Sequence, residues 1–210
     1  MRQALQSPAH EATLIDRLVD SMKTKANIII NKKLVEIISD KANYKDTAWQ
    51  EIKTDEATID SQDKAIAILK LIKKTYNEMD EISTAYNKGY QKPGTTVWND
   101  VLTNCETPQS KVLTIDPEIL DSLEIYFLAD VARDSNLNPY KIFKKVIVKK
   151  LENNVLATIH DEKSVVYRII NDEGVKETET LGGGMKKFAY NIEVVGGMIP
   201  FTNSWALVSK

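Results

Sequence analysis

The chain of 210 residues contains few side chains that could act as a nucleophile, a general acid or base, or a metal ligand. Its one cysteine, Cys105, follows Asn104 in a polar stretch. A catalytic thiol needs a partner that lowers its pKa, and the sequence around Cys105 implies none. A single cysteine also excludes an intrachain disulfide and a thiolate metal cluster. We therefore interpret Cys105 as a non-catalytic residue.

The two histidines, His10 and His160, could act as acid–base groups or metal ligands. His10 and Glu11 are not followed by the second histidine that a zinc-protease helix requires. We interpret His10 as a solvated residue at the start of a helix. His160 ends an expected strand beside Asp161 and Glu162, and we interpret it as a pH-sensitive group on the surface.

Two further motifs could bind ions. The glycines at 182–184 suggest a phosphate loop, but neither nucleotide-binding pattern can be written across them, and an alternating strand follows rather than a helix. We expect a flexible crossover there. An acidic cluster lacks the spacing and the central glycine of a calcium loop, so we expect a solvated loop that runs into a helix start. Its residues are Asp55, Glu56, Asp60 and Asp63.

Two lysines lie on each side of the apolar residues in the expected strand at 145–149. They are Lys144, Lys145, Lys149 and Lys150. Such lysines could contact phosphate, and they suit equally well the role of gatekeepers that protect an aggregation-prone strand. None of these candidates forms an active site. The sequence therefore predicts no catalytic residue, no cofactor-binding residue, no metal ligand and no cofactor, in a protein that is not an enzyme.

The composition agrees with a non-catalytic protein. The chain carries 28 Lys+Arg against 30 Asp+Glu, a net charge of −2, whereas proteins that grip nucleic-acid phosphates usually carry a basic excess. Hydrophobic residues make up 42% of the chain, enough for the core of one ordinary domain or of two small lobes. No apolar run approaches the roughly 20 residues of a membrane span, and the N-terminus lacks the apolar stretch of a signal peptide. We expect a soluble intracellular protein with no membrane partner.

Two amphipathic helices are expected in the first half of the chain. Apolar residues recur every three or four positions over 9–41, which predicts a helix about 50 Å long at 1.5 Å per residue. This length exceeds a compact domain of this size, and Ile28–Ile30 adds apolar surface, so we expect the helix to pack on something outside its own small domain. Residues 44–60 suit a short strand and a polar loop. A second helix begins after the N-cap Ser61 and ends before the break at Lys88–Gly94.

From residue 111 onward, short apolar runs alternate with helical segments, which indicates a mixed helix and strand architecture. The expected strands cover 111–115, 145–149, 155–160, 165–170, 188–195 and 205–208. The expected helices cover 117–122 and 126–135. Asp116 suits the N-cap of the first of these helices. We expect Gly196 and Gly197 to interrupt the strand that starts at residue 188.

Four collinear stretches, spread over residues 1–208, resemble the major capsid protein of tailed bacteriophages, which has the Hong Kong 97 fold, and in particular the version of small podophages of the phi-twenty-nine type. Leu14–Ala42 resembles the long spine helix of that family. Ala65–Tyr90 resembles a helix and a polar stretch that ends in a Tyr-Asn pair. Residues 112–169 resemble a buried strand, a helix and the strands with KVIV and NVLA, and Phe188–Val208 resembles the closing pattern.

The resemblance implies an α+β fold of the Hong Kong 97 type with a long spine helix, a peripheral lobe and an axial lobe. It places the peripheral lobe with the spine helix in residues 1–62, the axial lobe in 63–180, and the return strand with the C-terminal strand in 181–210. In the family an N-terminal arm and an E-loop precede the spine helix. Met1 falls almost at that helix, so we expect both elements to be missing here, and no crosslinking residue is carried over.

The resemblance also implies a structural subunit of an icosahedral bacteriophage capsid, which self-assembles into pentamers and hexamers around a DNA genome. The expected partners are copies of the chain, scaffolding and portal proteins, and packaged DNA held non-specifically on the inner face. The expected location is the virion, and the host cytoplasm during assembly. Gly89–Gly94 and Leu137–Pro139 are expected near the five- and six-fold axes. The alternative is a non-catalytic adaptor or regulator that binds a partner through the helix at 9–41; a hydrolase-like enzyme is disfavoured by the missing catalytic dyads.

Overall fold

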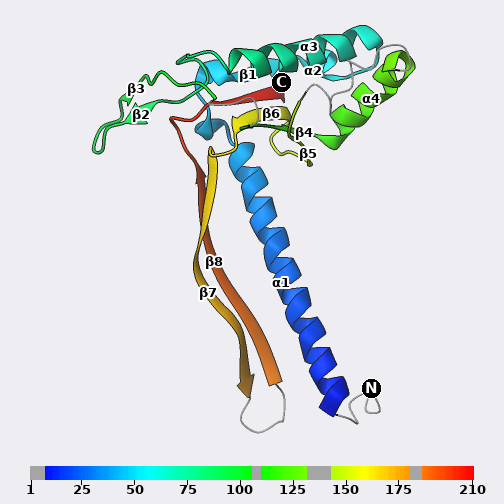
Figure 1. The fold of residues 1–210 in the computed structure, drawn as a ribbon, viewed down its shortest axis with the longest axis vertical. Coiled ribbons are helices and arrows are strands. Elements are labelled where there is room, and N and C mark those ends of the chain that lie inside the picture. The colour runs from blue at the N-terminus through cyan, green and yellow to red at the C-terminus, as the bar shows by residue number, and fades with distance from the viewer. Residues whose placement is uncertain (1–7, 106–109, 132–142, 180–185) are drawn as a thin grey trace. The chain divides into compact units, whose positions relative to one another are not determined.

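The computed structural model describes residues 8–105, 110–131, 143–179 and 186–210 (Figure 1). The chain divides into two units. The first unit comprises Met1–Leu34 and Tyr167–Gly196, and the second comprises Val35–Val166 and Gly197–Lys210. Three long elements cross the boundary between the units. They are helix α1 (Pro8–Ile38) and strands β7 (Val165–Glu179) and β8 (Lys186–Met198).

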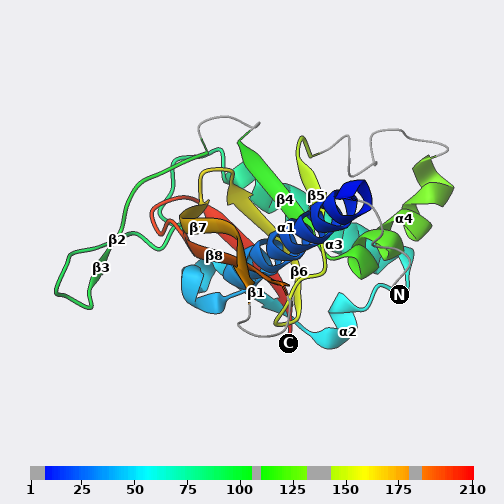
Figure 2. The same ribbon diagram turned by 90° about the horizontal axis from the view of Figure 1, so that it is seen from below.

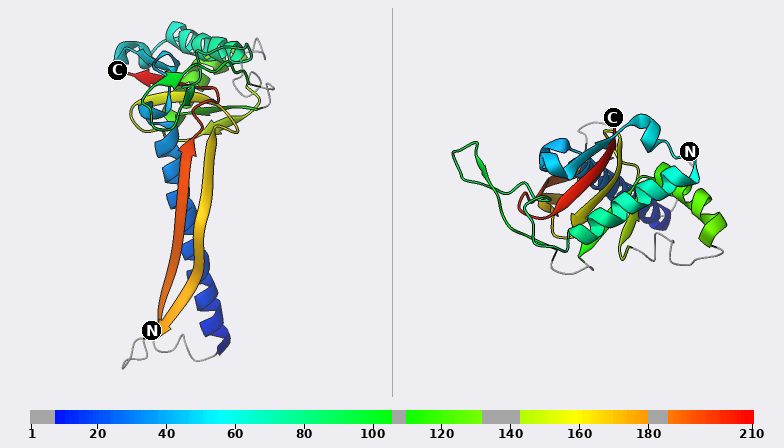
Figure 3. Two further views of the ribbon diagram at one scale, coloured as in Figure 1. Left: turned by 90° about the vertical axis from the view of Figure 1, so that its left-hand side faces the viewer. Right: turned by 90° about the horizontal axis from the view of Figure 1, so that it is seen from above.

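The first unit consists of most of α1 and of the two-stranded sheet β7–β8, which run alongside one another (left panel of Figure 3). With 31 residues, α1 is about 46 Å long at 1.5 Å per residue. The helix predicted over 9–41 is therefore confirmed, although it ends at Ile38. Strand β7 extends well beyond the predicted residue 170.

Strand β8 corrects one prediction, because it runs through Gly196 and Gly197 without interruption. A glycine keeps the N–H and C=O groups that a strand ladder requires, and a Cβ at Gly197 would meet nothing within 4 Å. The two glycines therefore lengthen the predicted strand 188–195 at its C-terminal end instead of ending it.

Helix α1 ends where nearby side chains satisfy its last carbonyl groups. Asn43 Nδ2 donates to the carbonyl of Ile37 at 2.7 Å, and the buried hydroxyl of Tyr44 donates to the carbonyl of Ile38 at 2.5 Å. Carbonyls in the last turn of a helix have no partner within the helix, so such bonds fix the point at which the chain leaves it. Burial raises the pKa of Tyr44, which keeps its hydroxyl a donor. Two 3-10 turns follow, Lys41–Asn43 and Asp46–Ala48.

The second unit is built on a five-stranded sheet with the order β1-β9-β6-β4-β5. Its strands are β1 (Trp49–Ile52), β9 (Ser204–Ser209), β6 (Val155–Asp161), β4 (Lys111–Ile115) and β5 (Val146–Val148). The pairs β1–β9 and β4–β5 are parallel, whereas β9–β6 and β6–β4 are antiparallel. Trp49 pairs with Ala206, so the two ends of this unit's chain meet in neighbouring strands. The strand predicted at 111–115 is confirmed to the residue.

Helices cover the sheet and close the core. They are α2 (Thr54–Ala57), α3 (Gln62–Glu78) and α4 (Pro117–Val131). Helix α3 begins after Ser61 as predicted, and its buried face packs on the sheet (right panel of Figure 3). Fully buried partners in that core are Ile72, Leu113, Ile159, Trp205 and Leu207. Among the described residues, no helix combines the length and the apolar character that crossing a bilayer demands.

Two predictions about the helices of this unit are wrong. Helix α4 is continuous across the predicted break between Ser122 and Tyr126, because Leu123 lies fully buried in the core and holds this turn. Residues Thr54–Ala57, predicted as a polar loop, form α2. Parts of other predictions, namely 132–135, Leu137–Pro139 and 182–184, lie outside the described residues.

A small hairpin projects from the second unit between α3 and β4. Its strands are β2 (Tyr90–Gln91) and β3 (Trp98–Asn99), paired antiparallel. Figure 2 and the right panel of Figure 3 show the hairpin at one end of this unit and α4 at the opposite end. The predicted loop at Gly89–Gly94 is therefore the first half of a projecting hairpin.

Candidate assembly surface

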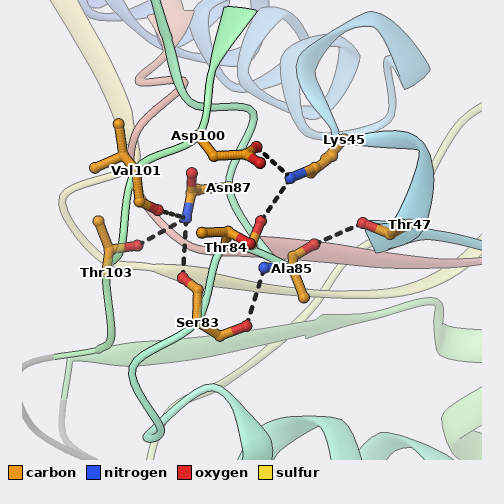
Figure 4. Close-up of polar contacts among 9 residues, drawn as sticks. All are labelled: Lys45, Thr47, Ser83, Thr84, Ala85, Asn87, Asp100, Val101 and Thr103. Carbon is orange, nitrogen blue, oxygen red and sulfur yellow. Dashed lines mark hydrogen bonds and ion pairs between the residues drawn. The ribbon is translucent and has the colours of Figure 1, made fainter.

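A buried asparagine holds the stem of the hairpin (Figure 4). The side chain of Asn87 is fully buried, and its Nδ2 donates to the carbonyl of Val101 at 2.9 Å, to Thr103 Oγ1 at 3.0 Å and to the carbonyl of Ser83 at 3.3 Å. Ser83 and Thr103 also exchange backbone hydrogen bonds of 3.0 and 3.1 Å. The two limbs of the stem are therefore joined to each other before the chain reaches β2.

Side chains after α1 attach this stem to the body of the second unit. Lys45 Nζ donates to the carbonyl of Thr84 at 2.8 Å and pairs with Asp100 Oδ1 at 2.7 Å (Figure 4). Thr47 Oγ1 donates to the carbonyl of Ala85 at 2.8 Å. One lysine thus contacts both limbs, because Thr84 and Asp100 lie on opposite sides of the hairpin stem. The stem is therefore held by contacts with the segment after α1 as well as by hydrogen bonds between its own two limbs.

The segment before β9 holds the stem from another side. The backbone N–H groups of Lys88 and Gly89 donate to the carbonyl of Pro200 at 2.7 and 3.1 Å. Thr103 Oγ1 donates to Asn203 Oδ1 at 2.6 Å. Hydrogen bonds between residues more than 90 positions apart in sequence therefore fix the direction in which the hairpin projects. Such pre-organisation reduces the entropy that a binding loop loses when it meets a partner.

Gly89 allows the hairpin to leave the stem. Its φ of +88° lies in the left-handed region, which L side chains rarely adopt. A Cβ at this position would also lie 2.2 Å from the backbone oxygen of Asn99. Only glycine fits here, and the close approach brings the two limbs together at the start of β2.

Beyond this stem the hairpin exposes large apolar side chains. Tyr90 is 51% exposed and Val97 is 64% exposed. Trp98 is less exposed, and Lys88 Nζ lies 4.8 Å from the centre of its ring. Apolar side chains on a projecting and anchored loop are typical of a surface that binds another macromolecule. The chemistry available at this site is recognition, by apolar contact and by the charge of the nearby lysines.

The candidate histidine of the sequence analysis lies elsewhere and is not on the surface. His160 is buried in β6 opposite Val112, and burial lowers its pKa to about 4. The prediction of a pH-sensitive surface group is therefore wrong, because β6 lies inside the sheet, with β4 on one side and β9 on the other, and His160 pairs with Val112 and Ser204. The side chain of His10 is not among those that the structure describes.

The candidate cysteine is buried as well. Cys105 is 2% exposed, and its N–H donates to the carbonyl of Met79 at 3.0 Å. Burial, with a smaller effect of Asp161, raises the pKa of its thiol to about 12. A nucleophilic thiolate needs the opposite shift, so the structure gives Cys105 the character of a packing residue.

The predicted ion-binding candidates lie on the surface. The acidic residues Asp55, Glu56, Asp60 and Asp63 are all exposed, and Asp60 pairs with Lys64 at 2.9 Å. Across the described residues, no group of three or more histidine, cysteine or carboxylate side chains is arranged to hold a metal. Near β5, Lys145 pairs with Glu162, and Lys150 pairs with Glu118. Ion pairs within the chain engage these two lysines.

One buried charge was missed by the sequence analysis. Lys111 begins β4, yet its side chain is completely buried, with Nζ 2.8 Å from Asp80 Oδ2 and 3.9 Å from the centre of the Tyr76 ring. Its Nζ also donates to the carbonyl of Tyr76. A lysine at the edge of a short apolar run usually signals a strand end in water. Nothing in the sequence marks the tertiary contacts that bury this one.

Known proteins are similar to this chain in family and in fold. A family model described as Phi29-like phage major capsid protein matches residues 1–208. No match was found among curated proteins. Several chains in solved structures have a similar fold, and two of them are described below. One, described as the capsid structure of Staphylococcus phage Andhra, has a TM-score of 0.69 at 12% identity and covers 100% of this chain and 66% of the other.

The second similar chain comes from a structure of the head fiber and inner core protein gp22 of native bacteriophage P68, with a TM-score of 0.66 at 12% identity, covering 99% of this chain and 66% of that one. At this identity the two likenesses establish the fold alone. The chain spans about two thirds of the length of each solved chain that it matches. The α+β capsid fold predicted from the sequence is therefore confirmed.

Proposed function

The chain belongs to the family of Phi29-like phage major capsid proteins, and from this premise we propose how it acts in a shell. Members of this family are structural proteins, so the chain is a structural capsid subunit that self-assembles into a shell, and its place is the virion. The observation that carries this conclusion is the family match over residues 1–208, which leaves only two residues outside.

We propose that copies of the chain form pentamers and hexamers that close an icosahedral shell around a DNA genome. Rings of identical subunits need two different patches on each subunit, one for each neighbour. The second unit supplies two such candidates, since the hairpin β2–β3 and helix α4 lie at its opposite ends (Figure 2). Helix α1 supplies further contact surface, because Ile28 and Ile29 are 62% and 53% exposed.

The lobe assignment of the sequence analysis is kept as a proposal. Residues 1–62 and 181–210 would form the peripheral lobe and residues 63–180 the axial lobe. The long α1 and strand β8 suit a lobe that makes side-to-side contacts. The hairpin and α4 suit a lobe whose projecting elements meet those of other subunits.

The further partners are also proposals. A net charge of −2 supports an inner face that touches packaged DNA weakly and without sequence preference. Scaffolding and portal proteins in the host cytoplasm would guide assembly. We propose that the chain has no catalytic activity, which the burial of Cys105 and His160 supports.

The proposal is tested by the oligomeric state of the purified chain. Mass photometry and negative-stain electron microscopy over a range of salt, protein concentration and crowding agents are expected to show rings or closed shells. A chain that stays monomeric under all of these conditions contradicts the proposal. A stoichiometric complex with one host protein, formed through α1, would instead favour an adaptor.

A further inference from the structure

We propose that the side of the hairpin that carries Tyr90 docks on the exposed face of helix α4, around Asp121 and Ile125, in a second copy of this chain. The inference rests on the proposed function and deepens it by naming the two surfaces that meet. Four observations carry it: exposed apolar side chains at both places, opposite charge, an anchored hairpin, and the location of the two surfaces at opposite ends of one unit.

The register of the hairpin shows which side is free. Tyr90 pairs with Asn99 and Gln91 pairs with Trp98. Paired residues share a face of a sheet and successive residues alternate, so Tyr90 and Trp98 lie on opposite faces. Lys88 covers the Trp98 ring from 4.8 Å. The Tyr90 face is the one with the more exposed aromatic ring.

Helix α4 offers a matching apolar side chain. Ile125 is 67% exposed, whereas its neighbour Leu123 is fully buried against the core. Asp121 is exposed and precedes Ile125 by four residues, so the two side chains share one face of the helix. An isolated exposed isoleucine needs no partner. Here, however, Ile125 lies beside the carboxylate of Asp121, and the hairpin carries the complementary combination of an exposed apolar side chain, Tyr90, and a lysine, Lys92. This match makes the hairpin a specific partner for Ile125.

The charges of the two surfaces are complementary. Residues 88–99 contain no acidic residue, and of their two lysines Lys88 is engaged by the Trp98 ring and the carbonyl of Ala42, which leaves Lys92 to supply the positive charge. Helix α4 contains no basic residue, and its described side chains include three carboxylates, at positions 118, 121 and 124. Glu118 is already engaged by Lys150. Complementary charge at an interface favours correct encounters and penalises the pairing of two hairpins or of two α4 helices.

The arrangement in the second unit makes the contact intermolecular. The hairpin and α4 lie at opposite ends of that unit, in the view from below and in the view from above (Figures 2 and 3). A contact between two different patches on identical subunits is heterologous, and it closes into a ring when the rotation between subunits allows it. Anchoring of the hairpin by Asn87 and Lys45 keeps its direction fixed from subunit to subunit.

A charge-swap experiment tests the docking. Lys92→Glu and Asp121→Lys are each expected to lower the apparent association constant, measured by sedimentation velocity of the full chain, by about tenfold or more, because like charges then face each other. The double variant carries the swapped pair in every copy and is expected to return to within about threefold of the wild-type value. Lys70→Glu, on the exposed face of α3, is the matched control and is expected to leave association unchanged.

Cysteine crosslinking supplies a second readout. The double variant Val97→Cys, Ile125→Cys is expected to form a ladder of covalent oligomers on a non-reducing gel after mild oxidation, while each single variant gives dimers at most. The native Cys105 is buried and does not compete. Both positions are exposed, so the substitutions are expected to leave the fold intact, and thermal unfolding of each variant checks that.

The outcomes separate the two proposals. Wild-type rings that persist unchanged in both single charge variants, or the absence of a crosslinked ladder from an assembling double cysteine variant, overturn the docking and leave the shell subunit standing. A double charge variant as weak as the singles also overturns it. A wild-type chain that never associates overturns the docking and the proposed function together.

Discussion

The backbone oxygen of Asn99 lies where the side chain of any residue at position 89 other than glycine would begin. A Cβ on Gly89 would be 2.2 Å from this oxygen, and the φ of Gly89 is +88°. Two independent constraints, backbone conformation and close approach, therefore meet at the point where the hairpin leaves its stem.

Replacement of Gly89 by alanine is expected to destabilise the protein strongly. The left-handed backbone alone costs about 1–2 kcal/mol for a residue with a Cβ, and the clash with Asn99 adds to that cost. Gly94→Ala is the matched control, because Gly94 has a φ of +81° with nothing within 4 Å of the added Cβ. Urea unfolding of both variants measures the difference. Equal losses would show that the approach to Asn99 does not constrain position 89.

Replacement of Asn87 by alanine is expected to loosen the hairpin stem. The variant leaves the carbonyl of Val101 and the hydroxyl of Thr103 without the amide that now bonds them, at a cost of about 2–3 kcal/mol. Asn99→Ala removes only one long hydrogen bond, 3.4 Å to the carbonyl of Tyr90, and should be nearly neutral. Hydrogen exchange of residues 83–103 is the measurement. Unchanged protection in Asn87→Ala would contradict the role of this side chain.

The two partners of the buried ion pair, Lys111 and Asp80, are expected to differ in the stability that is lost when each is replaced. Asp80→Asn leaves the ammonium of Lys111 buried without its anion and is expected to cost about 3 kcal/mol. Lys111→Met removes the buried charge and leaves Asp80, 39% exposed, to water, so it is expected to cost less. The exposed pair Lys145–Glu162 is the control, since Lys145→Met should change stability by less than about 1 kcal/mol. Unfolding in guanidinium measures the loss of stability in each variant. A larger loss for Lys111→Met than for Asp80→Asn would contradict the claim that the unpaired buried ammonium is the costlier state.

The free energy of unfolding is expected to decrease as the pH is lowered below 6.5, because His160 is buried in its neutral form. Its pKa is about 4 in the folded protein against an ordinary value of 6.5, so below pH 6.5 the unfolded chain binds the proton more readily and the stability is lost progressively down to about pH 4. A shift of this size corresponds to at most about 3 kcal/mol. Comparison of the wild type with His160→Gln at pH 7 and pH 4.5 isolates this histidine from the carboxylates. A wild type that loses no more stability than the variant would show that burial does not suppress protonation.

The thiol of Cys105 is expected to be unreactive until the protein unfolds. With a pKa of about 12 the group is neutral at pH 8, and its side chain is 2% exposed. A thiol-specific colorimetric reagent should label less than one tenth of the native protein in the time that labels all of it in urea. Rapid stoichiometric labelling of the native chain would place Cys105 on the surface.

The elements that the sequence predicted best depend on local patterns. The run KVLTI predicts β4 to the residue, and the spacing of apolar residues after Ser61 predicts α3. These signals work because periodicity and turn chemistry act within a few residues. The break predicted inside α4 failed for the opposite reason, since Leu123 is held by contacts with residues far away in sequence.

The long helix, the mixture of helices and strands, the scarcity of catalytic groups and the resemblance to phage capsid proteins could all be inferred from the order of residues along the chain. The burial of His160 and Lys111, the pairing of the first strand of the sheet with the last, and the anchored hairpin with exposed apolar side chains near Gly89 became visible only in the folded protein. These features depend on partners up to about 160 positions apart, such as Trp49 and Ala206, and no local pattern encodes a contact that exists only after the chain has closed on itself.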